Sequence, residues 1–193
     1  MRKNAGVVMR NDSPSQATPE GIRASSSVRR PDAVPAPDCH ASVMTSPFHY
    51  ATSHIGLCVS DLGRSLRFYV DGLGFEEFAR FELERGIAEV DPPVKLTSLF
   101  VQKAGLRVEL LHYASPGVFG EPSKRRNQLG MTHFSFVVDD VDAAASDLVR
   151  YGGTIVAGTR SGQHDPDAVQ ILFLADPDGT RVELMRLAKG QQW

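Results

Sequence analysis

Two histidines and two glutamates occur in matching sequence contexts, and together they could bind a divalent metal ion. His54 and His133 each open an apolar, strand-like run that ends at an aspartate. Glu109 and Glu183 each lie in the same tetrapeptide, Arg-Val-Glu-Leu. The glutamate follows its histidine by 55 positions in the first copy and by 50 in the second. This repetition predicts a duplicated module, each copy of which supplies one histidine and one glutamate.

Two imidazoles and two carboxylates form a mixed nitrogen and oxygen ligand set, which suits Ni, Co, Zn, Mn or Fe(II). A six-coordinate ion would keep two positions for water or substrate oxygens, and as a Lewis acid it could stabilise an enolate. A ligand carboxylate that loosens during turnover could serve as general base, so Glu183 and Glu109 are also candidate catalytic residues. Use of only His54, His133 and Glu183 would instead match the facial triad of non-haem iron oxygenases.

The pattern of apolar residues predicts a β-α-β-β-β unit in each copy. Alternation in the first strand of each unit places the histidine on the face opposite the aliphatic side chains. Asp61 and Asp140 are expected to cap the two helices. The expected strands are 52–59, 75–84, 95–102 and 106–113 in the first unit, and 131–138, 154–158, 169–174 and 180–187 in the second.

A four-stranded sheet with one helix has one covered face and one open face, so two such units can pair around a cavity. We therefore expect an α+β fold in which two paired βαβββ modules form an open sheet around a central metal-binding cavity. Alternation along the strands indicates that all four candidate ligands can line this one concave surface.

The chain is predicted to contain a tail, one folded domain and a short C-terminal tail. Residues 10–47 are rich in Ser, Pro, Ala and Arg and have no apolar periodicity, which is typical of disorder. We expect residues 1–48 to be a disordered tail, with Met44 as an alternative start. The predicted parts of the folded domain, 49–188, are module one (50–114), a linker (115–129) and module two (130–188), followed by a tail over 189–193.

Composition argues against several classes of protein. The net charge is −2 and the basic residues are scattered, unlike the clustered basic face of a nucleic-acid platform. No apolar stretch is long enough to span a membrane, and the first residues do not resemble a secretory signal. Cys39 and Cys58 are the only cysteines, so no disulfide framework is indicated. These features favour a cytoplasmic enzyme that acts on a small molecule.

Other polar residues are weaker candidates for the site. Arg107 and Tyr113 share the strand face of Glu109 and could contact substrate. His112 is expected on the opposite face, where it packs or meets solvent. His164 lies in a polar loop that could cover the cavity.

The sequence resembles the vicinal oxygen chelate superfamily, the glyoxalase, bleomycin-resistance and extradiol-dioxygenase group. The resemblance implies paired βαβββ modules around one divalent metal, small-molecule substrates and, because many relatives pair modules between chains, a homodimer. Carried over to this chain, the implied metal ligands are His54, Glu109, His133 and Glu183. The motifs that carry the resemblance are at 53–62, 67–75, 130–141 and 176–184.

Within this group, the full His-Glu-His-Glu set resembles glyoxalase I. Two positions depart from it: Cys58 replaces the arginine that receives the thiol substrate, and Tyr113 replaces an asparagine. The first strand and the long linker look closer to methylmalonyl-CoA epimerase-like members, but the run 96–102 lacks their second catalytic glutamate.

Three functions follow from this resemblance. The leading interpretation is a metal-dependent isomerase or lyase that forms a metal-stabilised enolate of a small carbonyl or thioester substrate, as in epimerase-like or lactoylglutathione-lyase-like members. The first alternative is an Fe(II)-dependent extradiol-type ring-cleaving dioxygenase. The second is a non-catalytic small-molecule binding or resistance protein.

Overall fold

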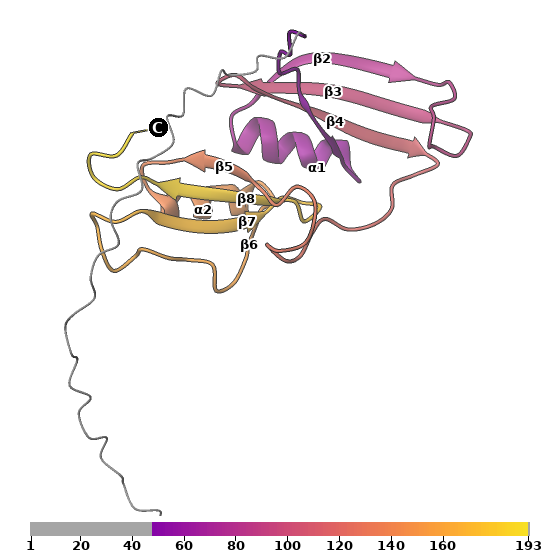
Figure 1. Cartoon of the computed structure of the whole chain (residues 1–193). Coiled ribbons are helices and arrows are strands. Elements are labelled where there is room, and N and C mark those ends of the chain that lie inside the picture. The colour runs from indigo at the N-terminus through magenta and orange to yellow at the C-terminus, as the bar shows by residue number, and fades with distance from the viewer. Residues whose placement is uncertain (1–47, 193) are drawn as a thin grey trace, which may run out of the picture. The chain divides into compact units, whose positions relative to one another are not determined.

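Residues 48–192 are described by the computed structural model, and they form two β-α-β-β-β units in chain order (Figure 1). Nearly all of the predicted disordered tail, including Met44, lies outside the described residues. The first module comprises β1 (Ile55–Cys58), α1 (Leu62–Leu66), η1 (Arg67–Gly72), β2 (Glu76–Leu83), β3 (Lys95–Lys103) and β4 (Leu106–Ser115). The second comprises β5 (Phe134–Val137), α2 (Val141–Arg150), β6 (Thr154–Ile155), β7 (Gln170–Ala175) and β8 (Arg181–Arg186). The predicted α+β duplication is confirmed.

Each module forms its own four-stranded mixed sheet. The strand orders are β1-β4-β3-β2 and β5-β8-β7-β6. In both sheets the first strand of the module runs parallel to its last strand, whereas the other neighbours are antiparallel. The parallel pairing places the start of the first strand, where each histidine lies, beside the strand that carries the glutamate.

The two helices begin where the sequence predicts, at aspartate caps. The Asp61 carboxylate accepts a hydrogen bond from the backbone N–H of Arg64 at 2.9 Å. The Asp140 carboxylate accepts two, from the N–H groups of Asp142 and Ala143, at 3.0 and 2.9 Å. These bonds satisfy N–H groups that have no partner within the helix.

The first helix widens after one turn into the π-helix η1. The N–H of Leu73 donates to the carbonyl of Phe68 at 2.9 Å, a bond that spans five residues. Phe68 and Tyr69 in this wide turn are both fully buried. The sequence pattern predicted a helix here but not its change of geometry.

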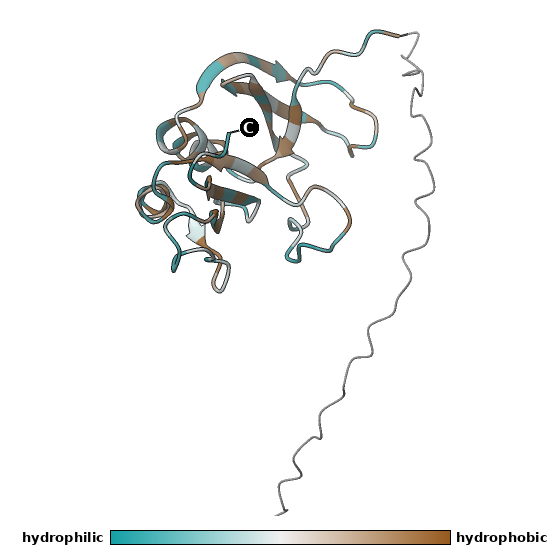
Figure 2. Cartoon of the chain, turned by 60° about the vertical axis from the view of Figure 1, so that its left-hand side comes forward, coloured by the Kyte–Doolittle hydropathy of each residue, from teal (hydrophilic) through white to brown (hydrophobic). Residues whose placement is uncertain are grey.

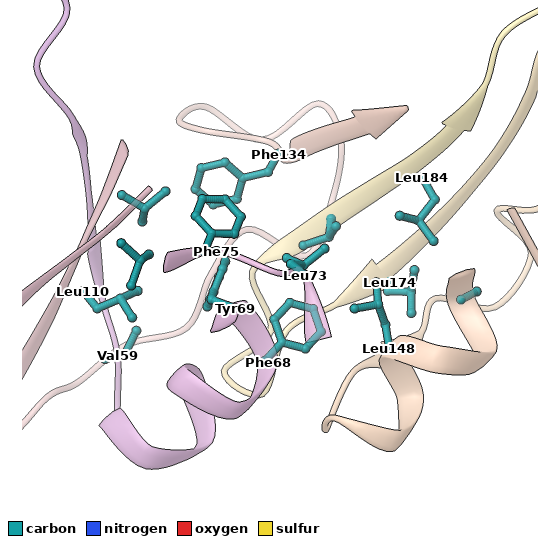
Figure 3. Packing of buried hydrophobic residues seen from close by; sticks show 14 of the residues in the cluster. Val59, Phe68, Tyr69, Leu73, Phe75, Leu110, Phe134, Leu148, Leu174 and Leu184 are labelled. Atoms are coloured by element: carbon teal, nitrogen blue, oxygen red, sulfur yellow. The ribbon is translucent and has the colours of Figure 1, made fainter. Parts of the chain in front are cut away.

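The helix-side faces of both modules share one hydrophobic core (Figure 3). Side chains from η1 and from the residue before β2 meet side chains of β5 in edge-to-face aromatic contacts. The ring centroids of Tyr69 and Phe134 are 6.4 Å apart, and those of Phe75 and Phe136 are 6.0 Å apart. The two modules therefore pack through the faces that bear the helices.

Hydrophobic and hydrophilic residues alternate along the strands (Figure 2). In β1, Ile55 and Leu57 pack against the core, whereas Gly56 and Cys58 are exposed. This alternation confirms that the face of β1 on which His54 was placed lies opposite the aliphatic side chains. None of the helices among residues 48–192 is both long enough and apolar enough to span a membrane.

Three predicted strands are shorter than expected. The first strand of each module was predicted over 52–59 and 131–138, but β1 contains only Ile55–Cys58 and β5 only Phe134–Val137. The sequence pattern predicted a strand over 154–158, but β6 contains only Thr154–Ile155. The N–H of Val156 still donates to the carbonyl of Phe173 at 2.9 Å, and the chain turns at Gly158, which has a positive φ of 73°.

Candidate metal centre

The first predicted pair of ligands lies on the open face of the first sheet. His54 directly precedes β1, and Glu109 lies in β4, where it is in register with Gly56. The Nε2 atom of His54 is 3.0 Å from the Oε2 atom of Glu109. The imidazole keeps a third of its side-chain surface exposed and the carboxylate a sixth, so an ion could reach both groups from solvent.

The second pair repeats this arrangement on the second sheet. His133 directly precedes β5, and Glu183 lies in β8, in register with Ser135. The Nε2 atom of His133 is 3.6 Å from the Oε2 atom of Glu183. Glu183 is buried, with a relative exposure of 7%. Duplication has thus produced two His–Glu pairs with the same strand positions.

Each imidazole is held by two matching neighbours. The hydroxyl of the preceding residue, Ser53 or Thr132, is hydrogen-bonded to the histidine Nδ1 at 2.9 Å in both modules. A phenylalanine in register with the glutamate packs edge-to-face on the ring: Phe100 lies 5.0 Å from His54 and Phe173 lies 5.2 Å from His133. Because Nδ1 is occupied, Nε2 is the ring nitrogen that faces the carboxylate.

A serine hydroxyl orients each carboxylate, but the two serines come from different strands. Ser98 of β3 donates to Oε1 of Glu109 at 2.5 Å, which leaves Oε2 facing His54. Ser135 of β5 donates to Oε2 of Glu183 at 2.6 Å, so in the second module one oxygen faces both the serine and the histidine. The second pair, in which one oxygen faces both groups, has the longer distance between histidine Nε2 and carboxylate, 3.6 Å against 3.0 Å in the first pair.

The four candidate ligands do not gather within one chain. Residues 48–192 contain no group of three or more His, Cys, Asp or Glu side chains placed to hold a metal ion. We expected all four ligands to line one concave surface. Within one chain, the structure instead brings them together as two separate His–Glu pairs. The reason is that the modules pack through their helix-side faces, while each pair lies on the open face of its own sheet.

The chemistry and spacing of each pair fit two ligands of one divalent ion. Ligands about 2.1 Å from an ion, at angles of about 90 to 120° to each other, lie about 3.0 to 3.6 Å apart. The two observed separations, 3.0 and 3.6 Å, match this range. Each pair supplies one nitrogen and one carboxylate, so a single pair is half of the mixed ligand set that suits borderline divalent ions.

Beyond the pairs, the open faces carry exposed apolar side chains. On the first sheet, Phe78 and Phe81 of β2 are each about half exposed, and the Phe81 ring packs on Phe100 at 5.9 Å. At the second pair, Met131 and Val137 are also about half exposed. Apolar side chains around a polar pair are typical of a surface that is covered by a ligand or a protein.

A cavity of about 600 Å³ lies between β1, the linker and the start of β8. Its lining includes Cys58 and Thr132, the second of which is hydrogen-bonded to His133. Burial, with a smaller effect from the negative charge of Asp178, raises the pKa of the Cys58 thiol above its ordinary value. Cys58 is therefore a protonated thiol at neutral pH and not an activated nucleophile.

The weaker candidates fall in different places. His112 lies opposite the Glu109 face, as predicted, and its Nδ1 is 3.3 Å from the carbonyl of Val59. His164 is exposed in the loop before β7. Arg107 lies beside the first pair, over the ring of Phe78.

Sequence reasoning missed the residues that orient the ligands. A hydroxyl residue before each histidine, Ser53 and Thr132, is a repeated feature that could have identified them. Ser98 and Ser135 give no such signal, because they occupy different strands of the two modules and converge only through the sheet register.

A duplicated βαβββ fold with a His–Glu pair on each open sheet face defines a class of two-module proteins. A model of the Glyoxalase/Bleomycin resistance protein/Dioxygenase superfamily matches residues 51–184. The chain therefore belongs to this superfamily, as its motifs predicted.

Two relatives and one solved structure show how far the likeness extends. A catechol-2,3-dioxygenase of Bacillus subtilis (strain 168) is 29% identical over 135 residues, which are 68% of this chain and 41% of that protein. The chain thus spans about two fifths of the length of that relative. An uncharacterized protein of the same organism is 29% identical over 133 residues, 68% of this chain and 92% of that protein. The crystal structure of a glyoxalase family protein from Bacillus cereus has a TM-score of 0.60 at 16% identity, covering 74% of this chain and 97% of that one, which is a likeness of fold.

Proposed function

We propose that this protein is a divalent-metal-dependent enzyme that carries out isomerase or lyase chemistry on a small carbonyl or thioester substrate. The observation that supports this proposal is the repeated His–Glu pair. Each pair presents a histidine Nε2 to a carboxylate, and each has a hydroxyl on Nδ1, a serine on the carboxylate and a phenylalanine against the ring. Such orienting contacts are what metal ligands need, and isolated surface pairs have no need of them.

We further propose that the complete site forms between two copies of the chain. His54 and Glu109 of one copy would face His133 and Glu183 of the other, which gives two equivalent sites per dimer. Two findings support this arrangement: each pair lies on a separate open sheet face, and apolar side chains flank both pairs. A homodimer would cover these side chains and bring together four ligands that one chain keeps apart.

The residues have distinct roles in this proposal. The divalent ion, when bound, would act as the Lewis acid that stabilises the enolate form of the substrate. Glu109 or Glu183 removes and returns the proton next to the carbonyl. Ser98 and Ser135 hold the carboxylates in place through the hydrogen bonds described above. In the proposed dimer, the aromatic side chains around the first pair would be covered and would exclude water from the reacting atoms.

A ring-cleaving Fe(II) dioxygenase is the alternative favoured by the B. subtilis catechol-2,3-dioxygenase relative. That chemistry would use His54, His133 and Glu183 and leave Glu109 without a role. The side chain of Glu109 is nevertheless mostly buried, bonded to Ser98 and close to His54, as a ligand would be. A non-catalytic small-molecule binding protein is the third candidate, and the cytoplasmic location remains a prediction.

Elemental analysis of the purified full-length protein tests the proposal. The protein is prepared anaerobically, without chelator or a histidine tag, beside Glu109→Ala, His133→Ala and the control His112→Ala. We expect close to one Ni, Co, Zn or Mn per chain in the wild type and in His112→Ala, and loss of metal in the other two variants. Solvent deuterium exchange into an acyl thioester or α-hydroxy thioester then tests the isomerase or lyase chemistry.

Two other results would replace the proposal. Iron that remains in Glu109→Ala but not in His133→Ala, with oxygen consumption on catechol, would identify the dioxygenase. Absence of metal even after reconstitution, with tight binding of a small molecule, would identify a binding protein.

A further inference from the structure

Arg107 lies on the strand that carries Glu109 and is the one arginine or lysine of that strand. It precedes Glu109 by two residues, so both side chains point from the same face of β4. The parallel register pairs Ile55 with Val108, and this register continued by one residue places His54 opposite Arg107. Arg107 therefore occupies the strand position next to both candidate ligands, on their face of the sheet.

This guanidinium is held in place without being neutralised. Its central carbon lies 4.2 Å from the centroid of the Phe78 ring, and its Nε atom is buried with no hydrogen-bond partner. No carboxylate in the described part of the chain forms an ion pair with Arg107, because Glu109 turns to His54 and Ser98 instead. Arg107 also lines a cavity, so the other N–H groups of its guanidinium are the ones that can donate to a ligand.

A cavity of about 420 Å³ opens beside Arg107, at the end of the sheet where the β3–β4 turn meets the segment before β1. Ser53, which is hydrogen-bonded to His54, lines the same cavity. Lys103 also lines it, but its ammonium group donates to the carbonyl of Leu73. Arg107 is thus the cation in this cavity that remains without an oxygen partner.

We propose that Arg107 binds a carboxylate group of the substrate, immediately beside the carbonyl or thioester group that would react at the His54–Glu109 pair. The inference deepens the proposed function and rests on it for the identity of the reacting group. The planar guanidinium matches a carboxylate through two parallel hydrogen bonds, and the cation–π contact with Phe78 helps to hold it in place. The substrate class is then a small carboxylic acid that carries a carbonyl or thioester.

A singly charged carboxylate suits this cavity better than a doubly charged phosphate. The carboxylates of Glu76, in the cavity wall, and Glu109, beside it, add negative potential that opposes a second negative charge. Lys103 adds a second positive charge to the lining, but its ammonium group donates to the carbonyl of Leu73, which leaves Arg107 as the cation that can pair directly with the ligand.

The equivalent arginine of the second module is already engaged. Arg181 stands two residues before Glu183, as Arg107 stands before Glu109, but its guanidinium donates to the carbonyl of Lys124 in the linker. It also lines another cavity, together with Asp178. Of the two equivalent arginines in the chain, Arg107 is therefore the one that is available to hold the substrate.

The test is a titration of the ¹⁵N-labelled full-length protein with pyruvate, followed through the Nε–Hε resonance of Arg107 and, in every variant, through the backbone amide resonances of the cavity lining. That resonance is assigned by its absence in Arg107→Gln. Arg80→Gln is the matched control, because Arg80 is paired with Glu82 on β2. Titrations of chelator-treated and metal-loaded protein, and parallel titrations with inorganic phosphate, complete the set.

We expect pyruvate to shift the Arg107 resonance in both forms of the wild-type protein and of Arg80→Gln. Removal of a charge-assisted bidentate contact in Arg107→Gln should weaken pyruvate binding roughly 10- to 100-fold. Equal affinity of wild type and Arg107→Gln, or tighter binding of phosphate than of pyruvate, would overturn the proposal whatever the metal content. Arg107-dependent pyruvate binding by a protein that never binds metal would sustain the carboxylate anchor and remove the proposed metal chemistry instead.

Discussion

The hydroxyl of Tyr69 donates a hydrogen bond to Oδ2 of Asp176 at 2.9 Å, although the two residues belong to different modules. Both residues are buried. Asp176 also accepts hydrogen bonds from the N–H groups of Asp178 and Thr180, at 3.0 and 2.8 Å. The turn that leads into β8, the strand of Glu183, is thus fastened to the core of the first module.

Replacing Tyr69 with phenylalanine tests this connection. The ring and its packing remain, but the buried Asp176 carboxyl loses one of its donors. We expect Tyr69→Phe to lower the free energy of unfolding by about 1 to 3 kcal/mol, measured by urea denaturation. Tyr151→Phe, at a partly exposed tyrosine on the end of α2, is the control and should change it by less than about 0.5 kcal/mol. Equal effects of the two changes would show that the Tyr69 hydroxyl contributes nothing specific.

The same carboxyl should make stability depend on pH. Burial raises the pKa of Asp176 above its ordinary value, and the hydrogen bonds from Tyr69 and the two backbone N–H groups lower it without outweighing the burial. Ionisation therefore costs more in the folded than in the unfolded chain. The contribution of Asp176 to stability is complete below its unfolded pKa of about 3.9 and is lost as pH rises through the raised folded value.

Urea denaturation of wild type and Asp176→Asn between pH 4 and pH 7 measures this dependence. The difference in unfolding free energy, wild type minus variant, should fall as pH rises, because asparagine does not ionise. A difference that instead grows toward pH 7 would mean that the hydrogen bonds dominate and that the folded-state pKa is lowered.

Gly153 follows α2 at a close approach between the two modules. A Cβ atom there would lie 2.9 Å from a ring carbon of Phe68 and 3.0 Å from the carbonyl oxygen of Leu148. Gly153→Ala should lower the free energy of unfolding by about 1 to 3 kcal/mol through this crowding. Gly86→Ala, where a Cβ would meet nothing within 4 Å, should leave stability within about 0.5 kcal/mol of wild type in the same measurement. Equal losses of unfolding free energy in the two variants would show that the crowding of Phe68 and Leu148 by the added Cβ is not the cause.

The serines that orient the glutamates should affect metal affinity. Ser98→Ala and Ser135→Ala each free one carboxylate to rotate, so each should weaken metal binding about 10- to 100-fold. Competition with a chromophoric chelator gives the dissociation constants. Ser146→Ala, at an exposed serine of α2, is the control and should bind metal as tightly as wild type. Wild-type affinity in both site variants would remove the serines from the metal centre.

Much of the fold could be predicted because its signals are local and repeated. Alternation along β1 fixes which face His54 occupies, and aspartates at 61 and 140 mark both helix starts. The π-helical turn after Leu66 could not be predicted, since its cause is the packing of Phe68 and Tyr69 against residues distant in sequence.

The site was predictable only in part, because part of it depends on long-range packing that leaves no local signal in the sequence. Alternation along the strands predicts that the histidine and the glutamate of each module share one sheet face, and the parallel register seen in the structure brings each histidine to its own glutamate. How the two modules pack depends on long-range contacts such as Tyr69 with Phe134, which no local pattern contains. Sequence periodicity therefore predicts the pairs, whereas their assembly into one centre remains a proposal.

Mixing of two inactive variants tests that assembly most directly. One chain carries His54→Ala with Glu109→Ala, and the other carries His133→Ala with Glu183→Ala. The two are purified separately and also co-expressed with different tags that contain no histidine. If the site lies between two copies, each variant alone binds no metal, but a mixed dimer regains one intact site from the undamaged module of each chain.

Metal content per chain is the measurement, with size-exclusion chromatography to confirm the dimer. Random pairing makes half of the dimers mixed, and each of these has one of its two sites, so we predict about a quarter of the wild-type metal content. Affinity selection for both tags should raise the content to about half of the wild-type value. No metal in the doubly selected dimer, beside a wild type that is fully loaded, would contradict a centre shared between two copies.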